Sequence, residues 1–197
     1  MHPDLIDLIS LTRVPQVGCV HARILLQHFG SVESIFKSSV QSLEKIEGIG
    51  KIRARSIKNF RDFSGSEKEI YFIQRAGIRA LALDDPEYPN RLLSACDAPV
   101  LLFYKGNTDL NHSRIISIVV TRLYTDYGKD ITENLIRDLA PYSVTVVSGP
   151  AFGIDAIVHK SAIWYSLSTI GVLAHGLATL YPPGYSLLSK QMIKQGD

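Results

Sequence analysis

The sequence of 197 residues has few of the residues that build disulfide-linked or metal-bound scaffolds. Its two cysteines, Cys19 and Cys96, stand in unrelated contexts, which excludes a disulfide framework or a cysteine-based metal site and fits a reducing cytoplasm. No stretch is long and apolar enough to cross a bilayer, and residues 1–7 hold no apolar run of signal-peptide length. We therefore expect a cytoplasmic protein with no membrane association.

The signatures of common enzymes are also missing. The sequence contains no nucleophile elbow, no Walker lysine and no cluster of metal-ligand residues. The glycines of residues 148–153 do not have the Gly-x-Gly-x-x-Gly spacing of dinucleotide-binding folds. No general base stands beside a nucleophile, so we expect no catalytic residue, no cofactor and no metal, and a site that holds its ligand without breaking bonds.

Charge is distributed unevenly along the chain. The net charge is only +2, but residues 1–65 carry nine Lys or Arg against six Asp or Glu. Five cations fall within eleven residues that contain no acid: Lys51, Arg53, Arg55, Lys58 and Arg61. Two interpretations stay open, namely a solvated helix face or a surface that faces phosphates.

The first 60 residues alternate short amphipathic helices with glycine turns. Gly30 is placed to end a helix that begins near His21, and Ser31 is placed to cap the next one. Two turns, residues 14–18 and 46–50, share the pattern apolar–x–x–apolar–Gly before a helix. This pair resembles two helix-hairpin-helix motifs, in which glycine and helix amides approach a nucleic-acid backbone. The secondary DNA-contact candidates are Gly18, Gly48, Gly50, Lys51, Arg53 and Arg55. A hairpin pair that serves only packing is the alternative.

The remaining residues read as an α/β domain. Phe63–Ser66 is expected to be a flexible linker that separates a helical domain (1–65) from a second domain (66–197). After residue 113, apolar strands alternate with amphipathic helices, which indicates a parallel sheet with helices on both faces. Such sheets bind ligands beyond the carboxyl ends of their strands. Three segments are expected there: Thr121-Arg122, residues 148–155 and residues 174–176.

The second of these segments predicts a phosphate site. A β-branched strand, residues 144–147, leads through a glycine-bearing turn into a helix that begins near Gly153. Free amides and the positive end of a helix dipole converge at such a turn. Arg122 can add paired hydrogen bonds to phosphate, or instead pair with an acid such as Asp126. The candidate DNA- or phosphate-binding residues are Thr121, Arg122, Ser148, Gly149, Ala151, Gly153, Ile154, Asp155, His159 and Gly176.

Taken together, these motifs resemble the DNA-processing protein A family, called DprA or Smf. The resemblance covers essentially the whole chain. The stretches that carry it are residues 85–89, 98–107, 119–122 with Tyr127-Gly128, 148–155 with His159, and 171–177 with Tyr181-Pro182.

The resemblance implies a cytoplasmic protein of natural transformation that binds single-stranded DNA. Such proteins protect incoming strands, load a RecA-type recombinase on them and form homodimers. It also implies a small helical, SAM-like front domain before an extended Rossmann-like fold, with Arg122 and residues 148–155 in the DNA pocket.

The chain departs from the family pattern at several positions. Val120 stands where the family has glycine, which is expected to narrow the pocket, and Pro150 removes one amide donor. Ala178 stands where aspartate is usual. The family continues past the equivalent of Asp197, so the second domain is expected to be incomplete at its C-terminal end. Two other functions remain open: a hydrolase of nucleoside monophosphates, and a protein-interaction scaffold with a vestigial pocket.

Overall fold

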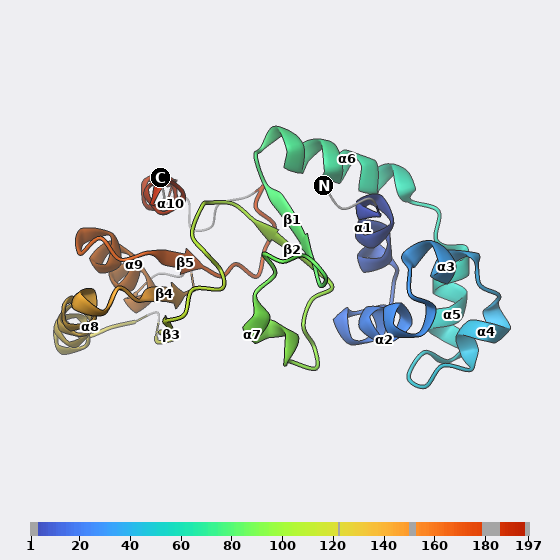
Figure 1. Ribbon diagram of the computed structural model, residues 1–197, viewed down its shortest axis with the longest axis horizontal. Helices are drawn as coiled ribbons and strands as arrows, with labels where there is room; N and C mark the ends of the chain where they lie inside the picture. The colour runs from blue at the N-terminus through green and yellow to red at the C-terminus, as the bar shows by residue number, and fades with distance from the viewer. Residues whose placement is uncertain (1–3, 122, 150–152, 179–185, 196–197) are drawn as a thin grey trace. The chain divides into compact units, whose positions relative to one another are not determined.

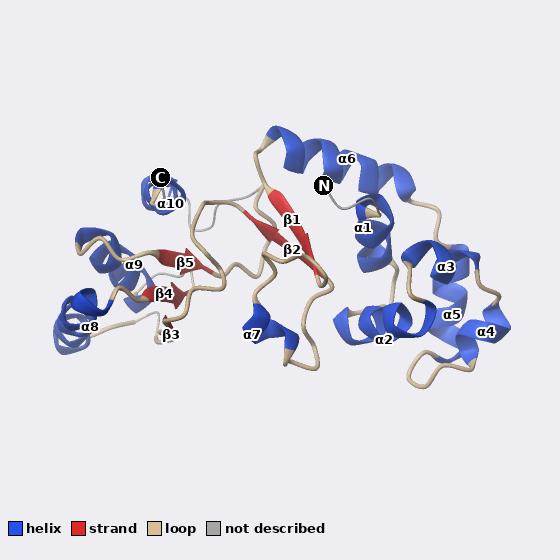
Figure 2. Ribbon diagram, viewed as in Figure 1, coloured by secondary structure: helices blue, strands red, loops and turns tan. Residues whose placement is uncertain are grey.

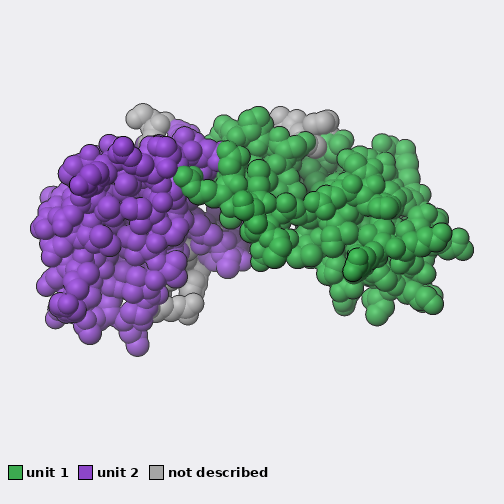
Figure 3. Space-filling model, turned by 60° about the horizontal axis from the view of Figure 1, so that its bottom comes forward, with its two compact units in different colours: residues 1–104 green, residues 105–197 purple. Residues whose placement is uncertain are grey.

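The structure is a computed structural model that describes residues 4–121, 123–149, 153–178 and 186–195. The chain divides into two compact units, residues 1–104 and residues 105–197 (Figure 3). The division by contacts falls at a different place from the domain boundary expected between residues 65 and 66. That boundary stays a prediction.

The first unit contains the helices expected from the glycine turns and capping residues (Figure 1). Gly30 ends the second helix in the left-handed conformation, with φ of 75°, and its amide donates to Leu26 O. Ser31 caps the third helix because its side chain accepts from the Ser34 amide. The helices are α1 (Leu5–Arg13), α2 (Cys19–Phe29), α3 (Val32–Lys37), α4 (Val40–Glu44), α5 (Gly50–Asn59) and α6 (Phe63–Arg75).

The predicted linker at Phe63–Ser66 is wrong, because these residues form the first turn of α6. The side chain of Asp62 accepts from the Gly65 amide at 3.0 Å, which caps the helix. Ser66 is buried, and its hydroxyl accepts a hydrogen bond of 2.8 Å from Ser10 on α1. Capping and burial thus order a segment whose composition alone is typical of a loop.

A two-stranded antiparallel ribbon completes the first unit (Figure 2). Strand β1 (Arg79–Ala82) pairs with β2 (Leu101–Tyr104), and the short α7 (Asn90–Leu93) lies between them in the chain. The core of the unit draws on both parts, since Ala82 and Val100 join helix residues such as Leu25 and Ile57. Full burial of a valine, leucine or isoleucine side chain, such as those of Val100, Leu25 and Ile57, contributes about 1.5–3 kcal/mol to folding.

The second unit holds a parallel three-stranded sheet in the order β3-β4-β5. Its elements are β3 (Ile115–Ser117), α8 (Asp126–Leu139), the 3₁₀ turn η1 (Ala140–Tyr142), β4 (Thr145–Ser148), α9 (Ile154–Trp164), β5 (Thr169–Gly171) and α10 (Ser186–Lys194). Helices α8 and α9 pack against each other, and α9 contacts β4 and β5. The predicted α/β architecture, with helices flanking a parallel sheet, is confirmed.

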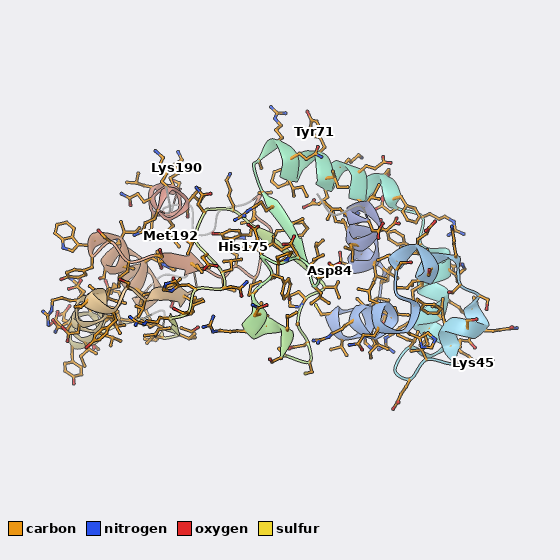
Figure 4. The ribbon with its side chains drawn as sticks, in the orientation of Figure 1. Lys45, Tyr71, Asp84, His175, Lys190 and Met192 are labelled. Atoms are coloured by element: carbon orange, nitrogen blue, oxygen red, sulfur yellow. The ribbon has the colours of Figure 1, made fainter. Side chains whose placement is uncertain are left out.

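Apolar residues of the sheet and its helices form the core of this second unit. Val146 on β4 and Val158 on α9 are fully buried, and Ile136 on α8 packs with them. Met192 lies on the side of α10 that faces β5, with its Cε close to Gly171 (Figure 4). Across the described ranges, none of the helices has both the length and the hydrophobicity that a bilayer crossing requires.

Candidate phosphate-binding site

The carboxyl ends of the three parallel strands lie at one edge of the sheet. The Ile118 amide donates to Val147 O at 2.8 Å, and the Val172 amide donates to Ser148 O at 2.9 Å. Beyond β3, Thr121 O accepts from the Ile154 amide at 3.3 Å, so the segment after β3 meets the first residue of α9. Two of the three predicted segments are therefore brought together in space. Gly176 is exposed, and its carbonyl is 3.1 Å from His175 Nδ1 in its own loop.

Gly149 and Gly153 are the described residues of the connection between β4 and α9. Gly153 has φ of 93° and ψ of −135°, a conformation that residues with a Cβ rarely adopt. A Cβ added at Gly149 would lie 2.8 Å from Asp155 Oδ2. The predicted strand and helix are present, while residues 150–152 between them lie outside the described residues; backbone geometry explains Gly153, and the close approach of Asp155 explains Gly149.

The start of α9 offers fewer amides than the sequence suggests. The Ile154 amide is engaged by Thr121 O. Among the residues that the structure describes, the amides of Asp155 and Ala156 have no hydrogen-bond acceptor. Because α9 is an eleven-residue helix with its positive dipole end at this point, these two amides form the part of the site that can hold an anion.

The side chains of Ser148 and Asp155 face inward. Both residues are buried. The Ser148 hydroxyl lies 2.7 Å from Ile118 O and 3.0 Å from Asp155 Oδ1, and its single proton serves these two acceptors. An anion at the start of α9 would be repelled by the carboxylate of Asp155. Binding there therefore calls for a cation such as Arg122 to offset that repulsion.

His159, one turn further along α9, is completely buried. Its Nε2 lies 3.1 Å from Gly149 O, and its Nδ1 lies 2.7 Å from the Thr169 hydroxyl on β5. Burial lowers the pKa of His159, and the Gly149 carbonyl and the Asp155 charge oppose that shift. The imidazole is thus tied to the end of β4 and to β5, and it does not reach the surface.

Arg122 and Ala151, which the sequence places in the site, lie outside the described residues. The same is true of Pro150, whereas Val120 is described and about half exposed, at 52%. Contact with DNA stays a prediction for all ten candidate residues. Sequence reasoning missed Thr169, which lies opposite Val146 in the register of the two strands.

The two turns of the helical half have the same backbone geometry. The Val17 amide donates to Val14 O at 3.2 Å, and 32 residues later the Ile49 amide donates to Ile46 O at 3.1 Å. The third residue of each turn has positive φ, 69° at Gln16 and 83° at Gly48, as type II turns require.

Arg53 connects the two turns. Its Nε donates to Gln16 O at 3.0 Å, and one terminal nitrogen donates to Gly48 O at 3.2 Å. Gly50 opens α5 with φ of 60°, whereas Gly18 opens α2 and lines a pocket of about 220 Å³ beside β2. Lys51 and Arg55 are exposed on α5. Contact of these residues with DNA also stays a prediction, and Arg53 has a structural task already.

Comparison with known proteins decides the family. The family model described as DNA recombination-mediator protein A matches residues 79–197, and a helix-hairpin-helix motif model matches residues 8–68. The chain belongs to the DNA recombination-mediator protein A family.

Individual members of the DNA recombination-mediator protein A family agree with this assignment. Protein Smf of Synechocystis is 32% identical over 192 residues, which covers 95% of this chain and 48% of that protein. DNA processing protein DprA of Bacillus subtilis is 34% identical over 146 residues, or 73% of this chain and 49% of that protein. The crystal structure of DNA processing protein A from Streptococcus pneumoniae matches 96% of this chain and 64% of that chain, with a TM-score of 0.75 and 25% identity. The chain spans about half the length of the curated relatives it matches.

Proposed function

We propose that the chain binds single-stranded DNA through its phosphates, at the site formed by Thr121, Gly149, Gly153 and the first turn of α9. The carrying observation is a pair of amides, Asp155 and Ala156, that have no acceptor among the described residues and lie at the strand edge where parallel sheets bind ligands. Family membership supports DNA as the source of the phosphate, because related proteins are named for DNA processing.

We also propose that the site binds the DNA strand without catalysing a reaction on it. The polar side chains of Ser148, Asp155 and His159 could act on a bound phosphate, but all three are hydrogen-bonded inside the unit. The Ser148 hydroxyl contacts Ile118 O and Asp155, and the His159 imidazole contacts Gly149 O and Thr169. A general base or nucleophile must present a free atom to its substrate. The arrangement therefore favours a binding protein over an enzyme, and the proposed site needs neither metal nor cofactor.

The finer parts of the proposal come from the family resemblance. The protein protects incoming single strands in the cytoplasm during natural transformation and loads a RecA-type recombinase on them. It does so as a homodimer. These statements concern the whole family member, of which this chain spans about half.

The direct experiment is a titration of labelled oligothymidylate, followed by fluorescence anisotropy at several salt concentrations, with a duplex of equal length in parallel. The proposal expects single strands to bind more tightly than duplex, with log affinity falling by about 0.7 per neutralised phosphate for each tenfold rise in salt. Arg122→Ala should flatten this slope by about 0.7, whereas Arg137→Ala, whose guanidinium faces Asp138 on α8, should not change it.

Two outcomes would contradict the proposal. Binding that is absent or insensitive to salt would remove DNA phosphate as the ligand. A thermal shift or turnover with a nucleoside monophosphate, without binding of any oligonucleotide, would instead support the hydrolase that the sequence left open.

A further inference from the structure

A buried histidine holds the backbone at the point where the chain leaves β4. A carbonyl oxygen can only accept, so the 3.1 Å contact with Gly149 O places the proton on His159 Nε2. Gly149 is the last described residue before the turn that ends at Gly153. Gly149 also lies against the side chain of Asp155 in the first turn of α9, so the position of its backbone bears directly on the site.

The Thr169 hydroxyl is the second hydrogen-bond partner of the His159 imidazole. It lies 2.7 Å from His159 Nδ1 and 3.1 Å from Val146 O. In a neutral imidazole with its proton on Nε2, Nδ1 is an acceptor, so the single hydroxyl proton serves two acceptors, Nδ1 and Val146 O. Burial favours this neutral form, since it lowers the pKa of His159.

We propose that His159 is a positioning residue for the phosphate site, which it shapes through Gly149 without touching DNA itself. The inference rests on the proposed function. Its geometric basis is a connected set of hydrogen bonds that runs from β5 through the imidazole to the last residue before the turn. The Asp155 carboxylate also lies close to Gly149, as shown by the 2.8 Å distance from Oδ2 to a Cβ built there.

Three substitutions separate this role from simple packing. Gln can place its amide nitrogen near the position of Nε2 and donate to Gly149 O, whereas Leu fills the space and donates nothing. Thr169→Val keeps the volume at that position but removes the hydroxyl that contacts His159 Nδ1. Circular dichroism melts establish that each variant is folded at the temperature of the binding assay.

We expect His159→Leu to weaken binding of oligothymidylate about tenfold, the factor carried by one hydrogen bond of ordinary strength. His159→Gln should stay within about threefold of the parent protein, and Thr169→Val should fall between the two. Equal loss in the Gln and Leu variants, or full affinity in folded His159→Leu, would overturn the positioning role. If His159→Leu does not fold, the other two variants still test the role. It then requires His159→Gln to bind within about threefold of the parent protein and Thr169→Val to bind more weakly than His159→Gln, and the opposite order would overturn it.

A measurement without DNA separates failure of this inference from failure of the proposed function. Imidazole ¹⁵N shifts of the labelled parent protein report which ring nitrogen carries the proton. The inference requires Nε2–H with a hydrogen-bonded, unprotonated Nδ1 at pH 7.5. The opposite tautomer would overturn it even if DNA binds, while lack of DNA binding by the parent protein would overturn the proposed function.

Discussion

Replacement of Gly149 by alanine tests the geometry of the site most sharply. The added methyl group would lie 2.8 Å from Asp155 Oδ2, closer than a carbon and a carboxylate oxygen tolerate. The carboxylate must therefore move. Because Asp155 is buried and its other oxygen lies 3.0 Å from the Ser148 hydroxyl, that movement breaks the Ser148–Asp155 hydrogen bond.

The cost follows from this broken contact. A hydrogen bond to a charged group contributes about 1.5–3 kcal/mol, so Gly149→Ala should destabilise the protein by about 2 kcal/mol. In an Asp155→Ala background the obstructing oxygens are gone, and the same change should cost less than about 0.5 kcal/mol. The two substitutions should therefore show a coupling of about 1.5 kcal/mol, typical of residues in contact.

The assay is urea unfolding of the four proteins of this cycle, followed by circular dichroism. Gly176→Ala serves as a matched control in the same unit, since no atom lies within 4 Å of its added Cβ, and its effect should stay within about 0.5 kcal/mol. Equal costs of Gly149→Ala in both backgrounds would refute the reasoning. So would a Gly149→Ala protein as stable as the control.

Three further predictions concern titration and the helical half. Since burial lowers the pKa of His159 below its ordinary 6.5, the folded protein keeps it neutral while the unfolded chain protonates it. The contribution of neutral His159 to stability is thus fully present above pH 6.5 and is lost as pH falls toward the lowered pKa. Between pH 7.5 and 5.5 the His159→Gln variant should therefore lose less stability than the parent protein, and equal losses would contradict this prediction. Arg53→Ala should lower the free energy of unfolding by about 1 kcal/mol, because the Gln16 and Gly48 carbonyls lose their donor. The control Arg55→Ala, at an exposed residue of the same helix, should lower it by less than about 0.5 kcal/mol. Equal losses would argue against the bridge between the turns. Gly48→Ala should cost about 1–2 kcal/mol because φ is 83°, and a cost below that of Gly18→Ala would show that the turn adopts another conformation.

Much of the helical half could be predicted because its signals are local. Gly30 and Ser31 act within one turn of their own position, so the sequence shows where those helices end and begin. The linker prediction failed because capping by Asp62 and burial of Ser66 against Ser10 depend on packing that composition does not reveal.

The sheet shows the same contrast. The parallel direction of the strands follows from the alternation of strands and helices, but β3 ends at Ser117 and β5 at Gly171, earlier than the apolar runs suggest. Apolar residues past those points, such as Val120 and Val172, are exposed.

The candidate site could be located from sequence, but its hydrogen bonds could not be assigned. Gly149 and Gly153 mark a place where a Cβ is excluded, and that constraint is visible in the residue types. The engagement of the Ile154 amide by Thr121 O joins residues 33 positions apart, and the pairing of His159 with Thr169 depends on strand register. No periodicity or spacing encodes either contact.

The central claim is that the amides at the start of α9 hold a DNA phosphate. The most direct test is a ¹H–¹⁵N correlation spectrum recorded during titration with oligothymidylate. The account predicts that the amides of Gly153, Asp155 and Ala156 shift progressively and saturate with the binding curve measured by anisotropy. Saturated binding that leaves these three amides unmoved would contradict it.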